Sequence, residues 1–290
     1  MSGPHAWMPV SPCGPGCLPA AGGLPAVAWT RRLLRLLCAG AVLLAGLVLA
    51  LALPLLAPVR RDRALRAWHR GLLRALRIQL RVIGDERFAA AGTGVLVVSN
   101  HTSWLDLIAL GAVQPLRMVA KSEVRGWPVI GLLARRAGTI FLERERLTTL
   151  PRTVETVSAA LTGGAAIGAF PEGTTWCGLA GGRFRPAVFQ AALDSATPVR
   201  PVALRYRLPG AGATVATTVA SFVGPTTLGE AVLRVAGVPG LVLEVHVLPL
   251  LSVTGTDRRA LAGRAEAAVT AVSLPVLTQP ADATTALRVG

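Results

Sequence analysis

Short apolar runs that fit strands alternate with longer amphipathic stretches that fit helices from residue 94 onward. Strands separated by helices form sheets with helices packed on their faces, so this alternation restricts the fold more than any other feature. The predicted strands are 95–99, 116–120, 139–143, 165–170, 199–206, 218–223 and 241–248, and the predicted helices are 103–113, 127–136, 150–162, 186–195, 227–236 and 257–272. We therefore expect an α/β fold with a mixed, mostly parallel sheet flanked by helices.

The most apolar stretch of the chain, residues 33–59, precedes these elements, and Arg35 is the single charge within it. About 20 apolar residues suffice to cross a bilayer, so the stretch predicts an N-terminal membrane helix. It is longer than the apolar core of a cleaved signal peptide, which favours an uncleaved anchor in the cell membrane. The basic C-terminal flank places the following domain on the cytoplasmic side by the positive-inside rule. A hairpin that lies in the membrane surface is the alternative.

Residues 60–82 predict a basic amphipathic helix directly after this anchor. Apolar side chains recur at helical spacing at Leu65, Trp68, Leu72 and Leu76, and arginines recur among them at Arg63, Arg66, Arg70, Arg74, Arg77 and Arg81. Such a helix suits the headgroup region of a membrane. The predicted organisation is a disordered leader (1–29), a membrane anchor helix (30–59), the interfacial helix (60–82), an α/β domain (83–273) and a tail (274–290).

The composition favours lipid over nucleic acid as the partner. Hydrophobic residues make up 52% of the 290-residue chain, mean hydropathy is +0.54 and net charge is +15. A positive, apolar chain favours an anionic membrane surface. Aromatic residues are only 4%, without the basic and aromatic stripe of single-strand binders, so we expect no nucleic acid. Cys13 and Cys17 have no paired Cys or His cluster nearby in the sequence, so no metal site is predicted.

Two polar turns follow predicted strands. The first carries His101 and, near the start of the next helix, Asp106; the second carries Glu172. The carboxyl ends of parallel strands meet at one sheet edge, where α/β folds display catalytic groups. A carboxylate that binds one imidazole nitrogen leaves the other nitrogen free to act as a base. His101 and Asp106 are therefore the predicted catalytic residues.

At these turns the sequence resembles the membrane glycerolipid acyltransferases, the family of 1-acylglycerol-3-phosphate acyltransferases. NHTSWLD, at 100–106, is similar to the family signature of Asn-His, four residues and Asp. GTIFLER (138–144), FPEGTT (170–175) and PVRPVAL (198–204) resemble its next three blocks, in family order. The similarity covers roughly residues 60–250. It implies a glycerol-3-phosphate acyltransferase-like fold.

The resemblance implies transfer of a fatty acyl chain from acyl-CoA or acyl carrier protein to a lysophospholipid hydroxyl. The acceptor it favours is 1-acylglycerol 3-phosphate. By position it assigns acceptor binding to Arg144, Glu172, Gly173 and Thr174, while Lys121, which follows a predicted strand, adds a cation for phosphate. Glu172 is expected to accept a hydrogen bond from a hydroxyl or to orient Arg144. No cofactor or metal is expected, because the acyl carrier is a co-substrate.

One position departs from the family pattern. Many members have arginine after Glu-Gly-Thr, whereas this chain has Thr175. Arg183 or Arg185 replaces that cation if the following loop folds back, and otherwise the acceptor is another lysolipid, such as a lyso-ornithine lipid. Two further alternatives are a lipid hydrolase in which His101 activates water, and a non-catalytic protein that binds anionic membranes. A serine hydrolase is not indicated, because Ser103 lacks flanking glycines.

Overall fold

The computed structural model of the chain describes residues 8–20, 22–143, 145–210 and 212–274. Among these residues, eight strands form one sheet in the order β1-β8-β6-β2-β5-β3-β4, with β7 paired to β6. The strands are β1 (Gln79–Gly84), β2 (Val95–Ser99), β3 (Arg117–Lys121), β4 (Ile140–Leu142), β5 (Ala166–Ala169), β6 (Val199–Pro209), β7 (Thr214–Ala216) and β8 (Val242–Val247). The run from β6 to β4 is parallel, and β8 and β7 are antiparallel to β6. The expected mixed, mostly parallel sheet is confirmed.

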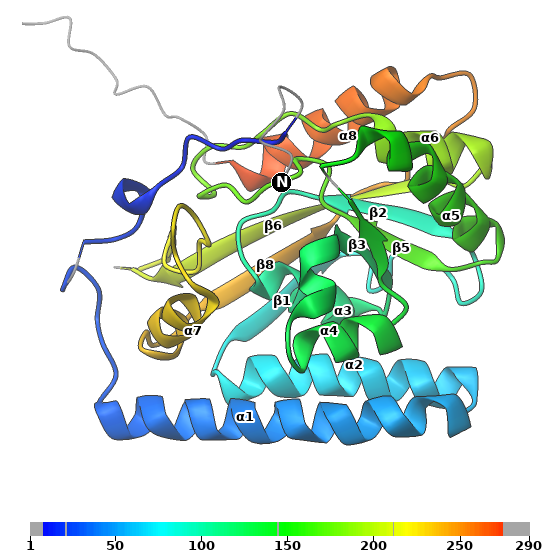
Figure 1. Cartoon of the computed structure of the whole chain (residues 1–290). Helices are drawn as coiled ribbons and strands as arrows, with labels where there is room; N and C mark the ends of the chain where they lie inside the picture. The colour runs from blue at the N-terminus through cyan, green and yellow to red at the C-terminus, as the bar shows by residue number, and fades with distance from the viewer. Residues whose placement is uncertain (1–7, 21, 144, 211, 275–290) are drawn as a thin grey trace, which may run out of the picture.

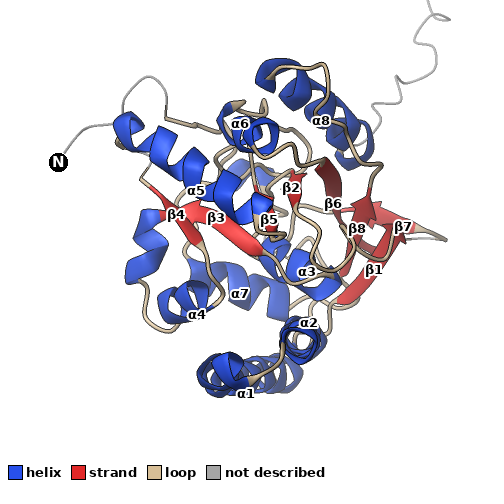
Figure 2. Ribbon diagram, turned by 90° about the vertical axis from the view of Figure 1, so that its right-hand side faces the viewer, coloured by secondary structure: helices blue, strands red, loops and turns tan. Residues whose placement is uncertain are grey.

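Helices cover both faces of this sheet (Figure 1, Figure 2). One face carries α1 (Trp29–Ala52), α2 (Pro58–Ala75), α3 (Leu105–Val113) and α7 (Leu228–Ala236), and the other carries α5 (Leu150–Thr162), α6 (Ala187–Asp194) and α8 (Arg258–Ser273). The remaining helices are α4 (Ile130–Arg136) and the short 3-10 helices η1 (Pro15–Cys17), η2 (Leu53–Leu55), η3 (Ser122–Gly126) and η4 (Leu147–Thr149).

The central strand β2 explains why both faces need cover. Val95 and Val97 lie in the core beneath α3, whereas Leu96 and Val98 lie in the core beneath α5 and α6, and all four side chains are fully buried. Alternate residues of a strand point to opposite faces, so a continuous apolar run requires a helix layer on each side. The four-residue run that predicted a buried strand therefore also fixes the three-layer architecture.

All six helices predicted in the α/β region are confirmed, with ends that lie within three residues of the predictions. Their N-termini include two well-formed caps. Thr227 and Glu230 form a capping box at α7, and the Asp257 carboxylate accepts from the Arg259 and Ala260 N–H groups at α8. These local hydrogen bonds satisfy N–H groups that have no partner inside the helix.

Two predicted elements are wrong. The basic helix predicted over 60–82 ends at Ala75, and its last residues form β1, which pairs in parallel with β8. Arg77, with φ of 58°, takes the left-handed conformation and separates the two elements. The strand predicted over 218–223 is a turn, in which the Ser221 N–H donates to the Thr218 carbonyl at 2.9 Å. Val219, Ala220 and Val223 are buried, but the segment does not pair with a strand. Its backbone groups bond instead to the Arg234 side chain on α7 and to the Thr102 carbonyl.

Helices α1 and α2 form an antiparallel pair at the base of the domain (Figure 1). The absent side chain of Gly46 lets the helices approach closely, because a Cβ there would lie 2.4 Å from Trp68 Nε1. The segment Trp29–Leu55 is long and apolar enough to cross a membrane, and only 22% of its most apolar window is buried. By contrast, α2 is enclosed between α1 and α3, so much of its apolar side contacts protein.

The segment before α1 contacts the domain at several points. The sequence predicts disorder over 1–29, but in the described residues Cys13 is buried and the Val27 N–H donates to the Gly237 carbonyl at 2.9 Å. Pro9 lies against Gly173, and Pro15 lies against Gly224. A composition rich in Gly, Pro and Ala gives no periodic pattern, but it does not prevent such contacts.

Candidate active site

The two polar turns meet at one edge of the sheet. His101 lies two residues after the end of β2, and Glu172 lies three residues after the end of β5. These strands are adjacent and parallel, with Val98 paired to Ala169, so both turns leave the sheet at its carboxyl edge. The backbone N–H of His101 donates to Glu172 Oε2 at 2.6 Å, and the Trp176 N–H donates to the His101 carbonyl at 2.7 Å. The predicted meeting of the two motifs is therefore present in the structure.

His101 and Asp106 are in direct contact. The Nδ1 atom of His101 lies 2.8 Å from Asp106 Oδ2, where an Nδ1–H group donates to the carboxylate. The Asp106 side chain is fully buried, whereas the His101 side chain is 23% exposed. Within the described part of the chain, no group bonds to His101 Nε2. The bond at Nδ1 selects the tautomer in which Nε2 carries a lone pair and can accept a proton.

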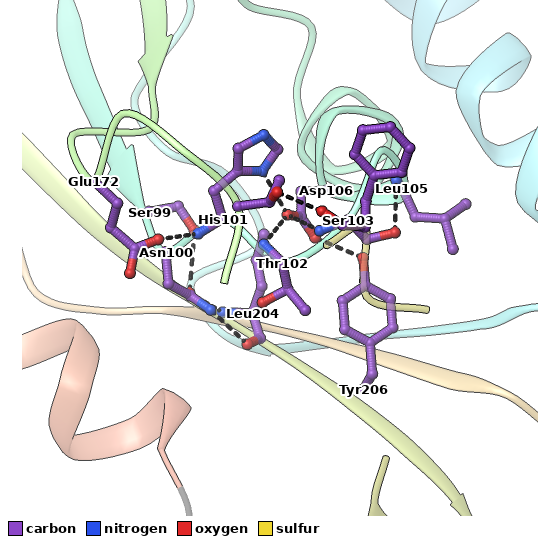
Figure 3. Close-up of polar contacts among 12 residues, drawn as sticks. Ser99, Asn100, His101, Thr102, Ser103, Leu105, Asp106, Glu172, Leu204 and Tyr206 are labelled. Atoms are coloured by element: carbon purple, nitrogen blue, oxygen red, sulfur yellow. Dashed lines mark hydrogen bonds and ion pairs between the residues drawn. The ribbon is translucent and has the colours of Figure 1, made fainter. Parts of the chain in front are cut away.

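Four donors hold the Asp106 carboxylate in place. Besides His101, Oδ2 accepts from the N–H groups of Thr102 at 2.7 Å and Ser103 at 2.8 Å, at the N-terminal end of α3. Oδ1 accepts from the Tyr206 hydroxyl of β6 at 2.5 Å. Figure 3 shows His101 and Tyr206 approaching Asp106 from different sides, with Glu172 across the His101 backbone. The carboxylate is thus fixed by local and long-range bonds before any substrate binds.

Further residues that the sequence did not single out position the His101 turn. The Phe170 ring stacks on the imidazole, with centroids 4.0 Å apart and planes 6° from parallel. The Asn100 side chain bonds to both backbone groups of Leu204 on β6, donating at 3.0 Å and accepting at 2.8 Å. Asn100 and Phe170 each adjoin a predicted site residue within the two motifs, so the sequence could have indicated them. Tyr206 lies 100 residues beyond Asp106, and nothing in its surroundings marks it.

Tyr206 gives a first prediction. Burial, followed by the nearby Asp106 carboxylate, raises the pKa of its phenol well above the usual value, so the hydroxyl remains a donor at neutral pH. Tyr206→Phe leaves Asp106 Oδ1 as a buried acceptor without this donor, which is expected to cost about 1–3 kcal/mol of unfolding free energy. We expect kcat to fall about ten-fold or less while KM stays near its original value. Thermal unfolding and steady-state kinetics measure both effects; unchanged values in both would contradict the positioning role.

Glu172 makes different contacts from those expected. Its carboxylate accepts from two backbone N–H groups, His101 at Oε2 and Gly182 at Oε1, the latter at 2.8 Å. The side chain therefore joins the His101 turn to the loop after Trp176. Arg144, the cation that Glu172 is expected to orient, lies outside the described residues. Burial raises the pKa of Glu172 to about 8, although the two N–H donors oppose this shift.

This raised pKa predicts a pH dependence of stability. Between the unfolded pKa, about 4.3, and the folded value, about 8, the folded protein binds more protons than the unfolded chain. The free energy of unfolding should therefore fall as pH rises through this window and level off above it, by a few kcal/mol in total. Glu172→Gln removes the titration and should flatten this slope. Denaturant unfolding at pH 5.5 and at pH 8.5 tests both proteins, and parallel slopes would contradict the assignment.

The other predicted binding residues lie at or near the same edge. Gly173 has a φ of 76°, which favours glycine, and it forms the Glu-Gly turn together with the half-buried Thr174. Lys121 ends β3, and its Nζ lies 5.8 Å from the centroid of the Trp127 ring. Arg144 lies outside the described residues.

The cation expected to replace the missing family arginine is close to this turn. The loop after Trp176 folds back, and the Arg185 N–H donates to the Pro171 carbonyl at 3.0 Å. Arg185 Cδ lies 3.7 Å from the position of a Cβ built on Gly173. The Thr175 hydroxyl, at the departing position, donates to the Phe222 carbonyl. The fold therefore brings the Arg185 side chain beside the Glu-Gly turn from a different part of the sequence.

Comparisons with known proteins show the family of this chain. Residues 79–205 match the family described as Acyltransferase. The chain is 34% identical over 213 residues to the lyso-ornithine lipid O-acyltransferase of Pseudomonas aeruginosa, covering 72% of this chain and 78% of that protein. It is 40% identical over 149 residues to the 1-acyl-sn-glycerol-3-phosphate acyltransferase of Neisseria gonorrhoeae, covering 51% of this chain and 58% of that protein.

A solved structure shares the fold. The crystal structure of the 1-acyl-sn-glycerophosphate acyltransferase PlsC from Thermotoga maritima superposes with a TM-score of 0.64 at 19% identity, over 83% of this chain and 92% of that one. The extent of the Pseudomonas match shows that the chain belongs to the acyltransferase family, as the four motifs indicated, and the solved structure shows the shared fold. The chain spans only 58% of the Neisseria relative's length.

Proposed function

We propose that this protein transfers a fatty acyl chain from a thioester donor, acyl-CoA or acyl carrier protein, to the hydroxyl of a lysophospholipid. The observation that carries the proposal is the hydrogen bond of 2.8 Å between His101 Nδ1 and Asp106 Oδ2, with Nε2 unbonded among the described residues. This arrangement suits a general base whose tautomer is fixed by a buried carboxylate.

In the proposed reaction, His101 Nε2 removes the proton from the acceptor hydroxyl as its oxygen attacks the thioester carbonyl. Asp106 stabilises the imidazolium that forms. The tetrahedral intermediate collapses with cleavage of the C–S bond, and the imidazolium returns the proton to the leaving thiolate. One C–O bond forms, one C–S bond breaks, and the histidine regains its starting state. The acceptor hydroxyl replaces the serine of a protease triad, so no acyl-enzyme is required.

We propose 1-acylglycerol 3-phosphate as the acceptor. A phosphate monoester needs cations, and a guanidinium can bind two of its oxygens at once. Arg185 beside Gly173 and Lys121 at the end of β3 supply charge near the carboxyl edge, and the middle block of the family assigns Arg144 to the same task. The Neisseria relative carries the name of this activity.

A lyso-ornithine lipid is the second candidate acceptor. The family arginine after Glu-Gly-Thr is replaced by Thr175, whose hydroxyl is occupied by the Phe222 carbonyl. The site therefore has one cation fewer at that position, which favours an acceptor without a phosphate monoester. The Pseudomonas relative, which matches a larger share of this chain, carries the name of that activity.

We further propose that α1 associates the protein with the cell membrane and that the α/β domain lies on the cytoplasmic side. Trp29–Leu55 is sufficiently apolar, and large side chains on α1 such as Leu37, Leu44 and Val48 are more than 60% exposed. Arginines follow this segment on α2, and they suit anionic headgroups.

An acceptor panel tests the substrate. The full-length protein, purified in detergent, is given labelled acyl-CoA with 1-acylglycerol 3-phosphate, a lyso-ornithine lipid or a lysophosphatidylcholine. Labelled phosphatidic acid should form with a kcat/KM at least ten-fold above that for the other acceptors. A preference for the lyso-ornithine lipid would contradict the first assignment and support the second. With a phosphate acceptor, Arg185→Gln should raise KM more than it lowers kcat.

A further inference from the structure

Three cysteines gather beside the candidate active site. The sulfur atoms of Cys13, Cys17 and Cys177 all lie within 4.8 Å of one another. Cys13 and Cys177 are buried, and Cys17 is partly exposed. Val223, Leu18 and Trp176 pack around them as a small apolar cluster. We call these three residues the cysteine cluster.

The sequence predicted no metal site, because Cys13 and Cys17 have no neighbouring Cys or His. The fold supplies the third sulfur from 160 residues further along the chain. Cys177 directly follows Trp176, whose N–H donates to the His101 carbonyl. Spacing alone could not reveal this group, because its third member comes from the loop after the Glu-Gly turn.

Backbone N–H groups lie close to two of the three sulfur atoms. The Cys177 N–H donates to Cys13 Sγ at 3.3 Å. Burial raises the pKa of the Cys177 thiol, and the backbone N–H groups of Leu179 and Ala180 oppose this rise. Hydrogen bonds from N–H groups favour the charged form of a side chain, and a metal binds the thiolate and not the thiol.

We propose that the cysteine cluster binds one Zn²⁺ ion, with solvent as the fourth ligand on the exposed side of Cys17. Zinc lies about 2.3 Å from each sulfur, so tetrahedral thiolates lie about 3.8 Å apart. The three sulfur atoms lie up to 4.8 Å apart, so the longest sulfur-to-sulfur distance must shorten by about 1 Å to bind zinc. Rotation of the cysteine side chains can provide this change. Each thiol that becomes a ligand releases one proton, so binding is tighter at higher pH.

Such an ion would link the segment before α1, which carries Cys13 and Cys17, to the loop after the Glu-Gly turn, which carries Cys177. Pro9 already lies against Gly173, and Pro15 against Gly224. The Ser221 hydroxyl donates to the Cys177 carbonyl at 2.8 Å, and the Phe222 N–H donates to the Thr102 carbonyl at 2.9 Å. The metal would thus stabilise the wall of the site from which Cys177 projects, without contacting His101.

The test measures zinc on the full-length protein, purified in detergent with a phosphine reductant, before and after a chelator. Wild-type protein should hold about one zinc per chain, and ZnCl₂ should rebind to the stripped protein. Co²⁺ should give sulfur-to-cobalt charge-transfer absorption. Cys17→Ser, whose site is partly exposed, and the buried Cys177→Ser should each weaken zinc binding at least ten-fold. The matched control is Cys38→Ser, an exposed cysteine on α1 outside the cluster, which should bind zinc like the wild type.

Two outcomes would overturn the proposal. They are a wild-type protein that binds neither metal, and a Cys17→Ser variant that binds zinc as tightly as the wild type. Alkylation of the unmutated protein gives an independent readout, because bound zinc should slow the reaction of Cys17 at least ten-fold. A rate that ZnCl₂ does not change would equally contradict the proposal.

Discussion

His101→Ala is expected to lower the rate of acyl transfer by at least a hundred-fold and up to about ten-thousand-fold, the contribution of a general base. Without the imidazole, no group at this position removes the hydroxyl proton. The variant should still associate with membranes, because α1 lies on the far side of α2 from the sheet. Transfer of a labelled acyl chain to the lysolipid measures the first effect, and vesicle flotation measures the second.

The matched control for this variant is His246→Ala. His246 lies on β8, where its Nε2 is 3.4 Å from a Glu244 carboxylate oxygen, and β6 separates β8 from β2, the strand that leads to the His101 turn. Its replacement should leave the rate of transfer within about two-fold of wild type. Full activity of His101→Ala, or equal losses of activity in both variants, would contradict the assignment of His101 as the general base.

Asp106→Asn should reduce kcat by about a thousand- to ten-thousand-fold, in line with the same change in a serine-protease triad. The amide keeps the volume of the side chain but loses the charge that stabilises the imidazolium. The carboxylate accepts hydrogen bonds from four donors, Tyr206 among them. The N–H group of the new amide would point at one of these donors in place of an acceptor oxygen. We expect KM for the lysolipid to change little, because Asp106 is fully buried and does not reach the acceptor.

Asp257→Asn is the control for this second prediction. Asp257 is exposed and caps the N-terminus of α8. Asparagine is an equally good N-cap residue, so activity and stability should hardly change. Steady-state kinetics over a range of lysolipid concentrations separate kcat from KM. If Asp106→Asn raised KM and spared kcat, Asp106 would be acting in binding and not in proton transfer.

Short-range signals in the sequence were enough to predict much of the fold. Val95–Val98 is apolar at every position, which marks a strand covered on both faces, and the structure buries all four side chains. His101 and Asp106 are five residues apart across a strand-to-helix turn, so their contact follows from local geometry. The same reasoning located Glu172, because adjacent parallel strands end at the same edge.

Long-range contacts were not predictable in this way. Tyr206 reaches Asp106 only because β6 lies beside β2, a pairing that no local pattern specifies. The regular spacing of the arginines predicts residues 79–82 as the end of a basic helix, whereas pairing with β8 makes them part of strand β1. The hydrogen bonds from the His101 and Gly182 N–H groups to Glu172 are likewise long-range contacts that no local pattern specifies.

The central claim is that the His101–Asp106 pair activates the hydroxyl of a lysolipid and not water or a protein nucleophile. The most direct measurement follows the label of a radioactive acyl-CoA on the purified, full-length protein, with and without lysolipid. We predict that the label moves into phospholipid when the acceptor is present and stays on CoA when it is absent. Release of labelled fatty acid without acceptor, or label attached to the protein, would contradict it.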